Sequence, residues 1–193
     1  ISNVYVPNLP QPYFWDSGHC IGQVYYFNDT SAYENSFPTW DFGDNTFGTG
    51  KNVTHFYAAP GTYLVKMAAQ SNYSTSTCTS DTIVKTVVVN PLPLPGFSAD
   101  TVCFGVSSTL KDSSVSNGGF IAKYAWNYGD GTADSAVPNP YVQHTFADTI
   151  YGNGDTTYNV RLFIATNLGC DSNVTEPVLV RQKPKASFTV SPD

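Results

Sequence analysis

The sequence predicts an all-β protein made of two tandem β-sandwiches, and three observations support this fold class. Helix formers are scarce, because the 193 residues include only two glutamates, Glu34 and Glu176, and one methionine, whereas Thr, Val and Tyr, which favour strands, are abundant. Aromatic residues make up 15% of the chain, which provides apolar area for a folded core. Strand-like runs recur about every 8 to 12 residues between Gly, Pro, Asn and Asp, a spacing typical of β-sandwiches.

An internal repeat divides the chain into two copies of one fold. When the sequence is shifted by 83 residues, Phe14 and Cys20 fall on Phe97 and Cys103. Later matches have slightly larger offsets, as expected where loops have gained residues and strands have not. These later pairs are Trp40 with Trp126, Asp44 with Asp130, His55 with His144, Tyr63 with Tyr158, and Cys78 with Cys170.

The repeat also predicts the domain boundaries. We expect domain 1 at residues 12–90, a proline linker at 91–95 and domain 2 at 96–182. Residues 1–11 read as the end of a preceding repeat, and 183–193 as a linker and the start of a third. Because the linker alternates prolines and directly follows the strand-like run Thr86–Val89, it is expected to be a semi-rigid, extended spacer.

Local patterns predict the main strands and turns of each copy. Tyr63, Val65 and Met67 alternate with the residues at 64, 66 and 68, and the apolar residues at 160, 162 and 164 alternate with those at 161 and 163, so each run has one face suited to a core. Gly43-Asp44-Asn45 and Gly129-Asp130-Gly131 have the residues of tight hairpin turns. Trp40 and Trp126 precede these turns, and one large aromatic on a central strand is typical of an immunoglobulin-like sandwich.

Four cysteines, one pair in each copy, predict disulfides. Pairing within each copy is the simplest of the three possible connectivities, and it joins Cys20 to Cys78 and Cys103 to Cys170. Each bridge would close a loop of roughly 60 residues and add about 4 kcal/mol of stability in the chain-entropy model. Such bridges imply an oxidising compartment. The alternative is buried free thiols.

The ordered motif in copy one resembles the PKD (polycystic kidney disease) domain. The residues that carry the resemblance are Trp40-Asp41-Phe42-Gly43-Asp44, then His55-Phe56-Tyr57, then Pro60-Gly61-Thr62-Tyr63-Leu64-Val65. Copy one departs from the family pattern at Asn45, where the family has Gly. Copy two has Asn127 and Tyr128 in place of Asp and Phe, and keeps Gly129, Asp130, His144 and Tyr158.

The resemblance implies two PKD-type sandwiches and a non-catalytic structural role. The added cysteines are similar to those of PKD repeats in large bacterial surface proteins that use type IX secretion. The expected function is that of semi-rigid spacer repeats in an extracellular or cell-surface protein, such as an adhesin, with neighbouring repeats of the same chain as partners. The alternative function is an accessory polysaccharide- or protein-binding module of a secreted hydrolase.

Composition excludes other classes of protein. The net charge is −6 and the isoelectric point about 4.8, whereas a nucleic-acid binder needs a basic surface. The sequence contains no run of about 18 apolar residues, so no transmembrane segment is expected.

Enzymatic motifs are absent, and the candidate acids and bases have simpler interpretations. His55 and His144 occupy equivalent repeat positions, which favours a structural role. Asp41 and Asp44 form a carboxylate pair, but Asn127 replaces the first acid in copy two, which favours turn capping over acid–base chemistry. We therefore expect no catalytic residues.

Calcium is a weaker expectation, and no cofactor is predicted. Some PKD domains resemble calcium binders through an Asp-x-Asp-Gly loop before the Trp strand. Here that loop reads Ser116-Asn117-Gly118-Gly119 in copy two and Glu34-Asn35-Ser36 in copy one, so the acid pair is missing. A calcium ion would then use Asp41 or Asp44 as its ligand.

Exposed aromatic residues are the candidate ligand contacts. The repeat does not explain Trp15, which follows the expected core residue Phe14 and should therefore face the opposite side of its strand. Tyr25, Tyr26 and Tyr33 are further candidates. The alternative interpretation of all four is ordinary sandwich surface or an interdomain contact.

Overall fold

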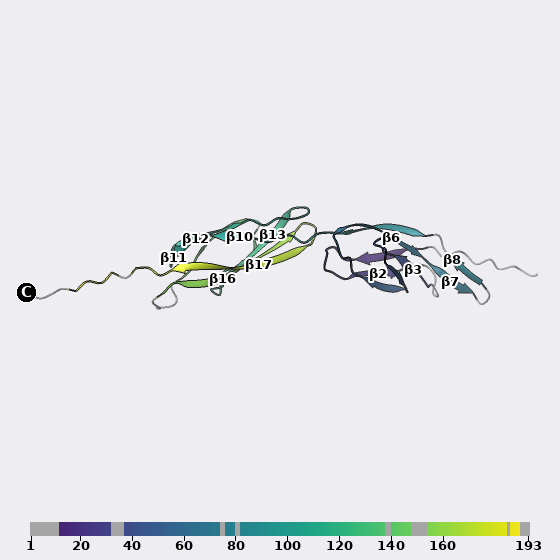
Figure 1. Ribbon diagram of the computed structural model, residues 1–193, viewed down its shortest axis with the longest axis horizontal. Helices are drawn as coiled ribbons and strands as arrows, with labels where there is room; N and C mark the ends of the chain where they lie inside the picture. Colours follow the sequence, from purple (N-terminus) through teal and green to yellow (C-terminus); the bar gives the residue numbers. More distant parts are fainter. Residues whose placement is uncertain are drawn as a thin grey trace, which may run out of the picture. The chain divides into compact units, whose positions relative to one another are not determined.

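The computed structural model describes residues 12–31, 37–73, 76–79, 82–137, 140–147, 154–184 and 186–189. The chain divides into two compact units, residues 1–91 and 92–193. The regular elements of the described residues are all β-strands, which confirms the predicted all-β class (Figure 1).

The first unit contains two antiparallel sheets and a hairpin. The three-stranded sheet has the order β1 (Phe14–Ser17), β2 (Tyr25–Asp29), β5 (Asn52–His55). The four-stranded sheet has the order β4 (Phe47–Thr49), β3 (Thr39–Asp41), β6 (Gly61–Ala68), β9 (Ile83–Val89). The hairpin consists of β7 (Gln70–Tyr73) and β8 (Ser76–Thr79).

The core of the first unit lies between its two sheets. Side chains alternate along each strand, so that β2 and β6 each have a buried and an exposed face. Both sheets contribute to one apolar cluster, whose buried members include Phe14, Tyr25 and Phe27 from the three-stranded sheet and Trp40, Val65, Met67, Val87 and Val89 from the four-stranded sheet. The unit is therefore a β-sandwich.

The second unit repeats this arrangement. Its three-stranded sheet has the order β10 (Phe97–Ala99), β12 (Ser107–Asp112), β15 (Tyr141–Thr145). Its five-stranded sheet has the order β11 (Val102–Cys103), β17 (Asp171–Arg181), β16 (Thr156–Thr166), β13 (Ile121–Asn127), β14 (Ala133–Val137). Strands β16 and β17 form the long hairpin drawn in green and yellow in Figure 1.

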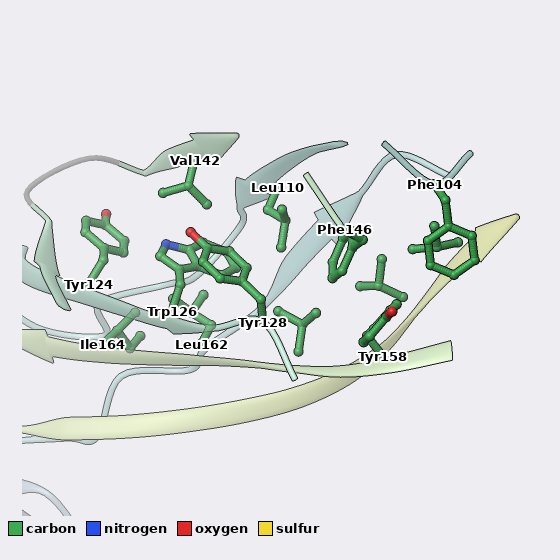
Figure 2. Packing of buried hydrophobic residues seen from close by; sticks show 13 residues of the cluster. Phe104, Leu110, Tyr124, Trp126, Tyr128, Val142, Phe146, Tyr158, Leu162 and Ile164 are labelled. Carbon is green, nitrogen blue, oxygen red and sulfur yellow. The ribbon is translucent and has the colours of Figure 1, made fainter. Parts of the chain in front are cut away.

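Figure 2 shows the core of the second unit. Leu110 and Val142, from the three-stranded sheet, face Trp126, Leu162 and Ile164, which come from the larger sheet. Leu110, Leu162 and Ile164 are fully buried. The predicted inward runs of 160–164 and of Tyr63–Met67 therefore supply core residues in their two units, Tyr63 being partly buried at the edge of its core.

The strand registers show that the sequence repeat is a structural repeat. Phe14 pairs with Asp29 in the first unit, and Phe97 pairs with Asp112 in the second. Both pairs carry the same offset of 83 residues that the sequence shows, since 97 − 14 and 112 − 29 are equal. The two sandwiches can therefore be compared position by position.

The residues at the end of the first unit and at the start of the second are hydrogen-bonded, each within its own unit. In the first unit, the Asn90 N–H donates to the His19 carbonyl, and the Asn90 carbonyl accepts from the Ile21 N–H. In the second unit, Leu94 exchanges two backbone hydrogen bonds with Val115. The Leu92 carbonyl also accepts from the Asn117 side chain.

Candidate functional site

The turn between β3 and β4 is built around Gly43, which has a φ of +82°. A side chain at this position would strain the backbone, and its Cβ would lie 2.8 Å from the Leu64 carbonyl oxygen. Asp41 caps the turn, because its Oδ1 accepts a hydrogen bond of 2.9 Å from the Gly43 N–H. The other Asp41 oxygen, Oδ2, lies 3.2 Å from Lys66 Nζ.

Asp44 and His55 connect the two sheets of the first unit. Asp44 Oδ2, in the β3–β4 turn of the four-stranded sheet, lies 2.7 Å from His55 Nε2 on β5 of the other sheet. Asp44 Oδ1 accepts from both the backbone N–H and the hydroxyl of Thr46. Burial alone would raise the pKa of Asp44, but the hydrogen bonds from Thr46 and His55 outweigh burial and hold this pKa below its ordinary value.

Aromatic rings enclose His55. The imidazole stacks on Phe42 with ring centroids 4.2 Å apart and planes 2° apart, and it meets Tyr57 edge-on at 4.5 Å. Tyr57 is buried and stacks in turn on Tyr63, while its hydroxyl donates to the Phe42 carbonyl. The motif residues thus form one packed cluster, and its histidine is held on three sides.

The second unit contains the same cluster. Asn127 Oδ1 caps Gly129 at 3.0 Å, so the amide does what the Asp41 carboxylate does in the first unit. Asp130 Oδ2 lies 2.7 Å from His144 Nε2, and His144 stacks on Tyr128 with centroids 3.8 Å apart. Phe146 replaces Tyr57 and stacks on Tyr158.

The two core tryptophans differ in one hydrogen bond. Trp40 donates from Nε1 to the Gly50 carbonyl at 2.9 Å. The buried Trp126 Nε1 has no partner among the described residues.

The oxygen atoms of Asp41 and Asp44, the candidate calcium ligands, already accept hydrogen bonds from protein donors. These donors are the Gly43 backbone, the Lys66 ammonium, Thr46 and His55. Within the described residues, no group of three or more His, Cys, Asp or Glu side chains is placed to hold a metal ion. The chemistry of this cluster is therefore mutual hydrogen bonding across the sandwich.

The four candidate ligand contacts differ in their exposure to solvent. Trp15 and Tyr26 are 57% and 55% exposed. Tyr25 is fully buried, so its proposal as a ligand contact was wrong: it points into the core, where it meets Tyr57 edge-on at 5.1 Å. Burial, followed by the charge of Asp16, raises the pKa of Tyr25 to about 12. Tyr33 lies outside the described residues.

Trp15 and Tyr26 lie on the same outward face of the three-stranded sheet. Trp15 pairs with Asn28 and Ser17 pairs with Tyr26, so the two aromatic residues are diagonal neighbours on adjacent strands. Asn52 and Thr54 on β5 continue the two rows, opposite Asn28 and Tyr26. We call this surface the aromatic face; it consists of Trp15, Ser17, Tyr26, Asn28, Asn52 and Thr54, which together with Phe27 and Val53 line a depression of about 430 Å³.

The sequence analysis missed the four polar members of the aromatic face. Their types are common in this chain, and their grouping depends on strand pairing across distant segments. Alternation around Phe14 and Phe27 places neighbouring residues outward, but only the register shows which outward residues meet.

The predicted disulfide between Cys103 and Cys170 is wrong. Cys103 has a free thiol, whereas Cys170 is in a disulfide. Cys103 pairs with Arg181 at one end of β17, and Cys170 precedes the other end at Asp171. A strand of this length spans roughly 33 Å, whereas the Cα atoms of a disulfide lie within about 7 Å of each other. Cys20 is also disulfide-bonded, and the side chain of Cys78 lies outside the described residues.

Comparisons with known proteins find a family match in the first unit. The sequence model of the family described as "PKD domain" matches residues 22–87, within the first unit. Polycystin-1 of Homo sapiens is 29% identical over 130 residues, which cover 67% of this chain, so the chain spans only 3% of the length of that relative.

Two solved structures are also similar. The PKD1 domain of Vibrio anguillarum Epp is 22% identical, with 49% of this chain and 99% of that chain covered and a TM-score of 0.39. The fibronectin(III)-like modules of Clostridium thermocellum CbhA are 13% identical, with 92% of this chain and 100% of that chain covered and a TM-score of 0.44. The first unit thus matches the PKD domain family over residues 22–87, and the second unit repeats its turn, histidine and aromatic cluster.

Proposed function

We propose that the chain is a non-catalytic structural segment of a larger secreted or cell-surface protein, such as an adhesin, in which the two sandwiches act as a semi-rigid spacer. The observation that carries the proposal is the hydrogen bonding of the segment between the sandwiches. A spacer must hold the segments at its two ends at a defined separation. A flexible connection would let that separation vary.

The residues on either side of Pro91 are held by hydrogen bonds within their own units. The backbone of Asn90 is bound within the first unit, and Leu92 and Leu94 are bound within the second. Pro91 lies between these bound residues, and its ring restricts φ to about −65°. This supports a connection that bends over a limited range.

Cysteine chemistry supports a location outside the cytosol. Cys20 and Cys170 are disulfide-bonded, and stable disulfides are rare where glutathione and thioredoxin keep thiols reduced. An extracellular or cell-surface location is therefore proposed, and export by type IX secretion is the finer expectation carried by the resemblance described above. Among the described residues, no helix has the length and apolar character needed to cross a bilayer.

The geometry of the histidines supports a non-catalytic role. His55 and His144 are each fixed by an aspartate and by stacking on an aromatic ring. Hydrogen bonding between the two sheets accounts for a histidine at the same position in both units, so no substrate is needed to explain it.

Small-angle scattering on two forms of the chain tests the spacer proposal. The second form carries a Gly-Ser-Gly-Ser insertion after Pro91, which adds a flexible stretch without altering the hydrogen bonds of either sandwich. We expect the natural chain to fit a narrow distribution of dimensions and the insertion form a clearly broader one. Equally broad distributions for both forms would contradict the proposal.

A further inference from the structure

We propose that the aromatic face of the first sandwich is a binding site for a neutral polysaccharide. This inference does not depend on the spacer role, since it concerns one face of one unit. It rests on the aromatic face, where two aromatic rings lie among four uncharged polar side chains over a depression of about 430 Å³.

The two rings are placed to contact one extended ligand. Trp15 and Tyr26 are diagonal cross-strand neighbours, a relation that separates the two positions by about 7–8 Å. Both are more than half exposed on a sheet whose opposite face is packed into the core. A tryptophan and a tyrosine side by side in solvent leave a large apolar area without a partner, which is characteristic of a binding surface.

The polar rim determines the class of ligand. Ser17, Asn28, Asn52 and Thr54 provide hydroxyl and amide groups that both donate and accept hydrogen bonds. A sugar ring has an apolar face of C–H groups, which packs on an aromatic ring, and hydroxyl groups around its edge. The aromatic face therefore offers stacking surfaces and hydrogen-bonding groups in the arrangement that a saccharide chain needs.

The absence of charge on the aromatic face favours a neutral ligand. None of its six residues is ionisable at neutral pH. The nearby acid Asp29 is buried and is hydrogen-bonded to Ser31, and the charge of Asp16 acts on the buried Tyr25. None of the six residues supplies a cation for an acidic polysaccharide, and an apolar protein surface would leave the two amides without hydrogen-bond partners.

The second sandwich provides an internal comparison. By strand register, Ser98 occupies the position of Trp15, Thr109 that of Tyr26, and Lys111 that of Asn28. The Lys111 ammonium lies 5.8 Å from the ring centroid of Tyr141, which occupies the position of Asn52. The same fold is thus built without the aromatic pair, so folding alone does not require Trp15 and Tyr26.

This comparison defines the variants for the test. Trp15→Ser and Tyr26→Thr replace each aromatic with the residue that the second sandwich carries at the same position, so the variants are expected to fold. Phe47→Ala is the matched control, because Phe47 is 74% exposed on β4 of the other sheet and Ala133 is its equivalent. Circular dichroism and thermal unfolding verify that each variant is folded.

The experiment measures depletion of the whole chain from solution by cellulose, chitin, mannan and xylan freed of its uronic acids, all insoluble and uncharged, with collagen fibres and cross-linked polygalacturonate as alternative probes. We expect retention on at least one neutral polysaccharide, at least tenfold weaker for Trp15→Ser and for Tyr26→Thr, and unchanged for Phe47→Ala. Soluble oligosaccharides of the retained polymer should shift the tryptophan fluorescence of the natural chain and not that of Trp15→Ser.

Three results would overturn the proposal. The first is retention on none of the four neutral polymers. The second is retention that Trp15→Ser and Tyr26→Thr leave unchanged. The third is binding to collagen or polygalacturonate alone, which would assign the face to a protein or to an acidic ligand.

Discussion

Asp44 lies 2.7 Å from His55 and joins the two sheets of the first sandwich through one hydrogen bond. The same pair recurs in the second sandwich as Asp130 and His144, also at 2.7 Å. In both units the aspartate belongs to the turn after the core tryptophan, and the histidine belongs to the three-stranded sheet. This cross-sheet pair gives the aspartate and the histidine of the motif the same structural role in both units.

Replacing His55 should destabilise the first sandwich. His55→Ala removes the hydrogen bond to Asp44 and the stacking on Phe42 and Tyr57, so we expect the free energy of unfolding to fall by about 2–3 kcal/mol. Urea unfolding followed by fluorescence measures this change. His19→Ala is the control, because His19 is exposed and only its backbone groups form the hydrogen bonds described above. Equal losses for both variants would contradict the role assigned to His55.

Stability should decrease in acid. The pKa values of Asp44 and Asp130 lie below their ordinary value in the folded state, so the unfolded chain takes up protons at higher pH than the folded chain. Their contribution is fully present above the unfolded pKa of about 4 and is lost as the pH falls through the folded pKa.

Urea unfolding at a series of pH values between about 6 and 2.5 tests this pH dependence. Asp44→Asn should flatten the curve below pH ~4, and Asp171→Asn, at an exposed position, should not. A variant curve parallel to that of the natural chain would show that Asp44 does not contribute.

Two glycines of one turn should respond differently to substitution. Gly129 has a φ of +76°, and an added Cβ would lie 2.7 Å from the Asn159 carbonyl oxygen, so Gly129→Ala should cost more than about 2 kcal/mol. Gly131 has a φ of +92° with open space around it, and Asn45 adopts a φ of 67° at the equivalent position of the first unit. Gly131→Asn should therefore change the stability by less than about 1 kcal/mol. Thermal unfolding of both variants provides the comparison, and similar costs would be inconsistent with the close backbone approach at Gly129.

Cys103 should react as a thiol in the native protein. It is half-buried and free, so iodoacetamide added without reductant is expected to label Cys103, while Cys20 and Cys170 should be labelled only after reduction. Peptide mapping by mass spectrometry identifies the labelled positions. Recovery of Cys103 in a disulfide-linked peptide would contradict the structure, and a folded Cys103→Ser variant would identify the labelled peptide.

The sequence predicted the features that depend on short stretches of chain. The turn from Trp40 to Asp44 and its counterpart at Trp126 contain residue types that favour particular backbone conformations. Because these residues are adjacent in the chain, the sequence alone is enough to recognise the turn. The repeat supplied the core positions in the same way, because Phe14 and Phe97 recur at a fixed offset. The equivalence of Asp41 and Asn127 indicated turn capping, and both residues accept a hydrogen bond from a turn glycine.

The features that depend on long-range register could not be predicted from the sequence. Tyr25 and Tyr26 are adjacent, and which one faces the core is decided by the pairing of β2 with β1 and β5. The cysteine pairing failed for a related reason. One pair in each copy suggested a bridge, but the direction of β17 places Cys103 and Cys170 at its opposite ends.

Residual dipolar couplings of the whole chain in a weakly aligning medium test the proposed semi-rigid spacer most directly. Couplings from the described strands of each sandwich give a separate alignment tensor for each unit. We expect the two tensors to have equal magnitude, because the proposed semi-rigid connection at Pro91 would make the two units align together. Clearly different magnitudes, of the size seen after a Gly-Ser-Gly-Ser insertion after Pro91, would show that the sandwiches move independently and would contradict the spacer function.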